Sequence, residues 1–132
     1  MLMKITITEV IKRENKKIVQ FKSSLGDGFG EWKLRSEPQE LDSYFVELNV
    51  EDNLIWSENV KLAKNNEMLI RDTNDGVMIL QGPIESIEDN GDRCFMRLEI
   101  DLFVFSCLNI PNHIQEYVKI TARKVGVFDI NL

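Results

Sequence analysis

The feature that most constrains the fold is the stretch from Val77 to Cys107, in which two apolar runs flank the dipeptide Asn90-Gly91. Asn-Gly is the strongest short-range signal for a β-hairpin, because both central residues of a type I′ turn need a positive φ angle. After this turn, apolar residues alternate with charged ones, apart from Phe95, and the apolar set is Cys94, Met96, Leu98 and Ile100. A period of two buries one face of a strand and leaves the other in water. We therefore predict two antiparallel strands joined at Asn90-Gly91.

The residues on either side of this hairpin extend the β pattern. Gly82-Pro83 interrupts the first run, and because proline cannot donate to a strand ladder we expect either a bulge there or a point where the strand leaves the sheet. Residues 99–101 could be a turn or the middle of one long bent strand, and we favour the turn. Residues 102–105 are apolar at every position, which is typical of a strand covered on both faces. Residues 117–130 predict a long final strand with a second bulge at Gly126.

The N-terminal half reads as further short strands. Residues 4–12 and the run through Phe21 predict a hairpin that turns at residues 14–16. Residues 23–31 contain three alternate glycines and are expected to form a flexible loop. Residues 44–50 predict a strand, whereas residues 54–64 fit either a strand or a short helix by periodicity.

These elements together predict an all-β protein. The chain has 132 residues, of which 43% are hydrophobic and 29% charged, as expected for one globular domain spanning residues 1–132. Many short strands without capped helical segments favour a single-domain antiparallel fold, either a partly open β-barrel or a sandwich, with little or no helix. The apolar runs are too short to cross a membrane, and the N-terminus lacks the apolar core of a secretion signal. We therefore expect a cytoplasmic protein.

Four segments carry a resemblance to a known superfold. VMILQGPIESI, RCFMRLEI, LFVFSC and EYVKITARKVGVFDI resemble the strands of a small OB-fold-like barrel, over roughly the C-terminal half of the chain. OB-folds usually carry a helix between their third and fourth strands, whereas residues 107–116 have room for one turn at most. The resemblance implies an OB-like barrel, and a superfold by itself implies no function.

Catalytic and metal-binding patterns are weak. The one histidine, His113, has no serine motif beside it, and the apolar setting of Cys107 argues against a Cys107–His113 dyad. Cys94 and Cys107 do not form a CxxC pair and are expected to be buried free thiols. One histidine and two separated cysteines do not supply a conventional zinc site. We therefore predict a non-enzyme with no catalytic residues, no metal and no cofactor.

The charges are segregated along the sequence. Residues 36–60 contain seven Asp and Glu and no Lys or Arg, whereas residues 1–35 carry eight Lys and Arg against four Asp and Glu. The formal net charge of −6 disfavours nucleic-acid binding, where phosphate contacts supply most of the affinity. An acidic segment with embedded aromatic residues instead suits a basic protein surface.

We therefore expect a non-catalytic protein-binding module, of which a bacterial immunity protein that neutralises a basic toxin, such as a nuclease, is the most concrete version. The predicted binding residues are Tyr44, Glu47, Glu51, Asp52, Trp56 and Glu58. The alternative is an OB-like protein that binds single-stranded nucleic acid through the basic N-terminal hairpin, with Lys12, Arg13, Lys16 and Lys17 as the phosphate contacts. Its candidate stacking aromatics are Trp32, Tyr44, Phe45 and Trp56. The oligomeric state is left open.

Overall fold

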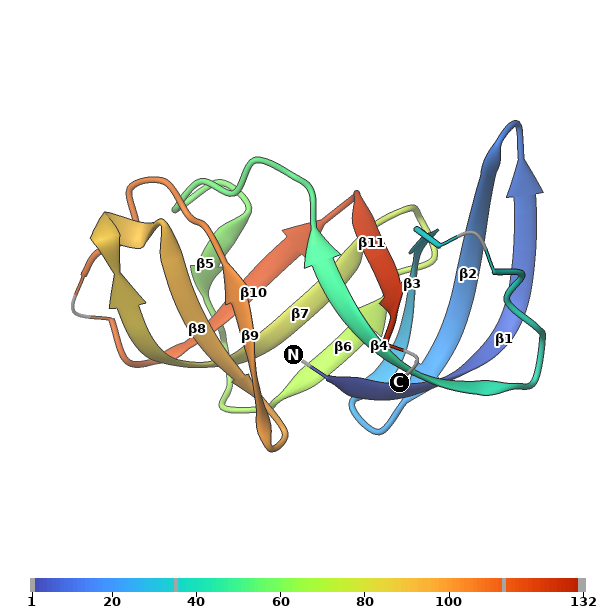
Figure 1. The fold of residues 1–132 in the computed structure, drawn as a ribbon. Helices are drawn as coiled ribbons and strands as arrows, with labels where there is room; N and C mark the ends of the chain where they lie inside the picture. Colours follow the sequence, from blue (N-terminus) through green and yellow to red (C-terminus); the bar gives the residue numbers. More distant parts are fainter. Residues whose placement is uncertain (1, 35, 113, 131–132) are drawn as a thin grey trace.

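The computed structural model describes residues 2–34, 36–112 and 114–130, and within them the chain is all-β. Eleven strands are formed in these residues, with no α-helix and a single 3-10 turn, η1 (Asp89–Gly91). Figure 1 shows the strands arranged in two groups that lie side by side along the long direction of the molecule. The predicted all-β fold class is confirmed.

The first group is a closed five-stranded barrel, in the order β1-β2-β3-β11-β4. Its members are β1 (Met3–Arg13), β2 (Lys16–Ser23), β3 (Gly26–Trp32), β4 (Ser43–Val50) and β11 (Val125–Asp129). Neighbouring strands are antiparallel except β3 and β11, which run parallel. Full closure leaves none of these five strands as a free sheet edge. The arrangement is compatible with the OB-like resemblance, and the predicted N-terminal hairpin and the strand over residues 44–50 are confirmed.

The second group is an antiparallel sheet in the order β5-β10-β7-β8-β9, with β6 also paired to β7. Its strands are β5 (Val60–Leu62), β6 (Leu69–Asp72), β7 (Met78–Glu88), β8 (Arg93–Leu98), β9 (Asp101–Phe105) and β10 (Tyr117–Ala122). The C-terminal half therefore builds mainly this sheet. The sequence resemblance to an OB-like barrel covers the C-terminal half, but the closed barrel forms from the N-terminal strands and takes only β11 from the C-terminal half (Figure 1).

The hairpin between β7 and β8 is confirmed, with a correction to its turn. Cys94, Met96 and Leu98 are buried as predicted. The φ angles of Asn90 and Gly91 are 56° and 100°. However, Glu88 pairs with Arg93, so four residues separate the strands and the turn is not a two-residue type I′ turn. The wider loop lets the carbonyl oxygen of Gly91 accept a hydrogen bond of 2.8 Å from the Cys107 N–H.

The turn between β8 and β9 is also confirmed, because Leu98 pairs with Asp101 across two residues. Ile100 lies at the tip of this turn and is 94% exposed, so its predicted burial with Leu98 is wrong. The prediction that residues 102–105 are covered on both faces is also wrong. β9 is the last strand of its sheet, and Val104 remains 45% exposed on the outer face.

β7 has a bulge, but it lies just after the predicted position: Gly82 and Pro83 pair regularly with β10, and the β7–β8 register shifts between Ile84 and Ser86. The final strand is different from the prediction. It divides into β10 and β11 at Arg123-Lys124, with no bulge at Gly126, because β10 pairs in the second sheet and β11 in the barrel. The chain therefore passes from one sheet to the other at Arg123-Lys124.

In the N-terminal half, the structure contradicts one prediction and decides between the two alternatives of another. Residues 26–32 form β3 and not a loop, because Gly28 and Gly30 face the barrel interior, where space is limited. A Cβ atom on Gly28 would lie 2.5 Å from the ring of Phe21, and one on Gly30 would lie 2.7 Å from Val127. Residues 54–64 contain isolated bridges and β5 rather than a helix.

The buried apolar side chains form one cluster that includes residues of the barrel and of the second sheet. Phe21 and Val127 contribute from the barrel, and Met96 and Phe103 contribute from the sheet. Cys94 and Cys107 are both buried and free, as predicted. Within the described residues, no helix has the length and apolar character needed to cross a membrane.

Candidate functional site

Asp52, one of the predicted binding residues, has a structural role in the fold. Its carboxylate accepts hydrogen bonds from the backbone N–H groups of Arg123, at 2.9 and 3.1 Å, and of Lys124, at 2.8 Å. The neighbouring Glu51 N–H donates to the carbonyl oxygen of Lys124 at 2.7 Å. Asp52 thus holds together the two points at which the chain leaves and re-enters the barrel.

The two predicted aromatic anchors, Tyr44 and Trp56, pack against the core. Tyr44 contacts Trp32 edge to face, with ring centroids 5.1 Å apart, and its hydroxyl accepts a hydrogen bond from the Gln39 N–H. Trp56 is half-buried beside the core, and its backbone N–H donates to Leu108. Trp32, a candidate stacking residue, is buried inside the barrel and is not accessible to a ligand.

The three predicted glutamates do not form one cluster around the aromatic residues. Glu47 lies on β4 and Glu58 lies in the turn before β5, both with exposed side chains. Glu51 is directed toward Lys33 instead, and its Oε2 atom lies 3.1 Å from the Nζ atom of that lysine. The structure therefore distributes the six predicted binding residues over several surfaces.

The fold also brings together the charges that the sequence separates. Glu37, from the acidic segment, lies 3.4 Å from the Nζ atom of Lys12 and 3.3 Å from that of Lys17. Hydrogen bonding to Lys17 and Lys12 lowers the pKa of the Glu37 carboxyl from its ordinary value. Two of the four cations predicted to contact phosphate are therefore paired with an acidic side chain.

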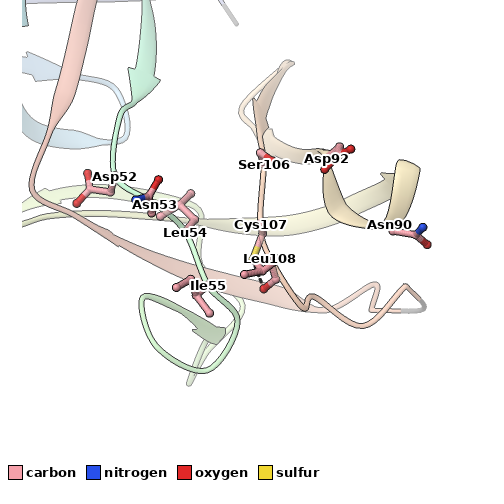
Figure 2. A pocket seen from close by; sticks show the side chains of 9 residues that line it. All are labelled: Asp52, Asn53, Leu54, Ile55, Asn90, Asp92, Ser106, Cys107 and Leu108. Atoms are coloured by element: carbon pink, nitrogen blue, oxygen red, sulfur yellow. Dashed lines mark hydrogen bonds between the residues drawn. The ribbon is translucent and has the colours of Figure 1, made fainter.

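One hollow, of about 400 Å³, lies between residues 52–55 and residues 106–108. Figure 2 shows these two segments facing each other, with Asp92 and Asn90 beyond residues 106–108. No Lys or Arg lines this hollow, so it offers no positive charge to an anion. Burial raises the pKa of the Cys107 thiol to about 12, which makes it a poor nucleophile.

The remaining catalytic and metal possibilities gain no support. Burial also raises the pKa of Cys94, to about 11. His113, the partner of the weighed Cys107–His113 dyad, lies outside the described residues. Among the residues that are described, no group of three His, Cys, Asp or Glu side chains is placed to hold a metal ion.

A groove on the barrel carries a more coherent set of side chains. Two hollows, of about 450 and 340 Å³, share Ile18 and Phe29 as lining residues and therefore lie next to each other on the outer face of β2 and β3. We call this combined surface the β2–β3 groove. It is lined by Ile11, Arg13, Lys16, Ile18, Gln20, Phe29, Gly30, Glu31, Lys33, Glu51, Asp72, Asn74, Gly76, Arg123, Lys124 and Val125.

The strand register explains why these side chains meet on one surface. Ile18 pairs with Glu31 on one side and with Ile11 on the other, while Gln20 pairs with Phe29. Directly paired residues lie on the same face of a sheet. Since successive side chains alternate, the glycines of β3 face the interior and Phe29 and Glu31 face outward.

The groove is locally positive although the whole chain is acidic. Five Lys and Arg line it against three Asp and Glu, a local sum of +2. Four of these cations form no ion pair with any described residue, namely Arg13, Lys16, Arg123 and Lys124. Phe29 is half-buried and lines both hollows. An aromatic ring flanked by unpaired cations can bind a ligand that combines planar rings with negative charge.

The fifth cation, Lys33, belongs to a small ionic cluster within the groove. Its Nζ atom lies 3.1 Å from Glu51 and 3.3 Å from the Oε1 atom of Glu31. The hydrogen bond to Glu51 is the main reason that the pKa of Lys33 is raised above its ordinary value. Both carboxylates are thus held in place by one ammonium group.

The sequence analysis did not identify Phe29, Lys33, Arg123 and Lys124 as candidate site residues. A signal for the first two is present in residues 28–33, where small or buried residues alternate with Phe29, Glu31 and Lys33. That alternation predicts a strand with one buried face and one face that carries Phe29, Glu31 and Lys33, but the glycines favour a loop. Arg123 and Lys124 join the groove only through the tertiary fold.

Comparisons with known proteins do not add an assignment: no protein-family description, curated protein or solved structure matches this chain.

Proposed function

We propose that this protein binds single-stranded nucleic acid in the β2–β3 groove. The observation that carries the proposal is the position of Phe29, which lines both hollows of the groove beside four cations that form no ion pair with a described residue. Proteins that bind single strands combine a positively charged groove with aromatic side chains on which bases stack. The net charge of −6 disfavours binding of a polyanion by the molecule as a whole, but the positive local field of the groove acts on the phosphates at closer range.

The barrel topology supports the same proposal. OB-folds bind oligonucleotides on the face of their second and third strands, together with the loop between strands 1 and 2 and the loop between strands 4 and 5. If this barrel is compared with an OB-fold, β11 takes the place of the fifth strand. The loop between strands 4 and 5 then corresponds to the long segment between β4 and β11. Arg13 and Lys16 then flank the loop between strands 1 and 2, and Arg123 and Lys124 lie at the end of the loop between strands 4 and 5.

The test is binding of fluorescently labelled single-stranded DNA and RNA, measured by anisotropy over a range of salt concentrations. We expect log affinity to fall with log salt, with a slope that reflects the number of phosphates contacted. Replacing Arg123 and Lys124 together by alanine should weaken binding and reduce that slope by about one to two. Phe29→Ala should weaken binding by roughly five- to a hundredfold through lost stacking, at unchanged salt slope.

Matched controls exist on other surfaces of the chain. Lys61 and Lys64 are exposed and do not line the groove, so their double alanine variant removes the same charge elsewhere. Phe45 is 53% exposed outside the groove and is the control for Phe29. Absence of binding to every oligomer at low salt, or equal losses in groove and control variants, would refute the proposed function.

A second candidate is the predicted protein-binding module, and one observation favours it. Phe45 and Val104 are exposed apolar side chains, and a hollow of about 360 Å³ in the same region is lined by Glu47, Val104 and Phe128. A basic partner, such as a toxin encoded by an adjacent gene, could place an apolar anchor and a cation there. Phe45→Ala should speed dissociation of such a complex, and Glu47→Lys should slow its association. No change in either rate constant would remove this candidate.

A further inference from the structure

We propose that the β2–β3 groove prefers bases that present an amino group, cytosine above all, over uracil and thymine. The discriminating residue is Glu31. This inference rests on the proposed function, because it concerns the base that stacks on Phe29 when a single strand is bound.

The position of Glu31 relative to Phe29 is the first observation. The two residues lie two positions apart on β3 and line the same groove. That spacing corresponds to about 7 Å along a strand, which is close to the width of a base. A base that covers the Phe29 ring can therefore extend its hydrogen-bonding edge toward Glu31.

The way in which Glu31 is held is the second observation. The Nζ atom of Lys33 lies 3.3 Å from Oε1 of Glu31, and Glu51 holds the same ammonium group from another side at 3.1 Å. The side chains of Glu31 and Lys33 are 26% and 24% exposed, so both are partly enclosed by the groove. Oε2 of Glu31 accepts no hydrogen bond within the described part of the chain. Glu31 is thus a carboxylate oriented through Oε1 by Lys33, with Oε2 open to a donor as far as the described residues are concerned.

The chemistry of the base edges determines which base this acceptor favours. Cytosine presents the N4 amino group, a donor that a carboxylate accepts well. Uracil and thymine present the O4 carbonyl at the same place, so two acceptors would face each other. We expect the difference to be roughly three- to tenfold in dissociation constant, the range of one hydrogen bond gained or lost.

Glu31 should also lower the overall affinity for a polyanion, because it brings negative charge to the phosphate-binding groove. Glu31→Gln removes that charge, and the amide can donate to a carbonyl as well as accept from an amino group. The variant should therefore bind oligodeoxyuridine more tightly than the native protein does, with the preference between the two bases reduced to near one. A gain in affinity combined with a loss of selectivity would not arise from a merely destabilised protein.

The experiment compares oligodeoxycytidine with oligodeoxyuridine of about eight nucleotides, within the usual site size of one OB-like barrel. These probes have pyrimidines of similar ring size, so differences in stacking are small. Anisotropy titrations at one salt concentration and at pH 8, where cytosine is neutral, give the ratio of dissociation constants. Glu58→Gln is the control, because it removes one exposed carboxylate outside the groove and should leave the ratio unchanged.

The outcomes separate this inference from the proposed function. Tighter binding of oligodeoxycytidine that disappears in Glu31→Gln supports the inference. Binding of both probes with equal affinity, or with oligodeoxyuridine preferred, overturns the inference and leaves the groove as a nucleic-acid site. A preference that persists in Glu31→Gln also overturns it, because Glu31 is then not the discriminating residue. If neither probe binds at low salt, the proposed function itself is refuted.

Discussion

Gly91→Ala should be among the most destabilising small substitutions in the chain. Gly91 is buried in the β7–β8 turn with a φ angle of 100°, in the region that side-chain-bearing residues rarely adopt. A Cβ atom at this position would lie 2.4 Å from the carbonyl oxygen of Cys107 and 2.8 Å from the Cγ2 atom of Ile110. The substitution therefore introduces both backbone strain and a steric clash.

The two effects can be given magnitudes. A left-handed backbone costs an L-residue about 1–2 kcal/mol. Insertion of a methyl group into filled space costs about a further 1–3 kcal/mol. The clash is with backbone as well as with a flexible side chain, so the neighbours cannot simply rotate away. We expect the free energy of unfolding to fall by about 2–5 kcal/mol in total.

Gly76→Ala is the matched control, because it isolates the backbone contribution. Gly76 also has a positive φ angle, 83°, but a Cβ atom there would meet nothing within 4 Å. Its substitution should cost only the strain, about 1–2 kcal/mol. The difference between the two variants then measures the clash at Gly91.

Equilibrium unfolding in urea, followed by circular dichroism, measures both variants. With a slope of about 2 kcal/mol per molar, a 2 kcal/mol loss lowers the midpoint by about 1 M. If Gly91→Ala is no more destabilising than Gly76→Ala, the close approach of Gly91 to Cys107 is not present in the folded protein.

Three further predictions follow from the same packing. Asp52→Asn should lower the free energy of unfolding by about 1–2 kcal/mol, because the Asp52 carboxylate accepts hydrogen bonds from the backbone N–H groups of Arg123 and Lys124. Urea unfolding measures this loss, with Glu58→Gln as the control. Gly28→Ala should cost about 1–3 kcal/mol by crowding Phe21, and an unchanged urea midpoint would contradict the packing. Burial raises the pKa of Cys94 to about 11 and of Cys107 to about 12, above about 8.5 in an unfolded chain. The stability contributed by these protonated thiols is complete below about pH 8.5 and is lost as the pH rises through 11 and 12. The urea midpoint should therefore fall between about pH 8.5 and pH 12, and it should fall less in a Cys94→Ala, Cys107→Ala double variant.

Much of the secondary structure could be predicted from the sequence, because alternation is a local signal. The buried set of β8, the positive φ angle at Gly91 and the N-terminal hairpin each depend on residues close together in the chain. The burial of the two cysteines followed from the apolar runs around them. Where local signals conflicted, as in residues 26–32, the glycines suggested a loop although the tertiary packing required a strand.

The barrel and the groove were decided by contacts between distant residues. Alternation indicates which face of a strand is buried, but it does not name the strand on either side. The hydrogen bonds from Arg123 to Asp52 span 71 positions, and they accompany the passage of the last strand from the sheet into the barrel. The same passage places Arg123 and Lys124 beside Phe29, and the barrel closure sets Glu51 against Lys33. The sequence thus determined the all-β class and the hairpins, whereas the candidate site exists only once the distant strands are paired.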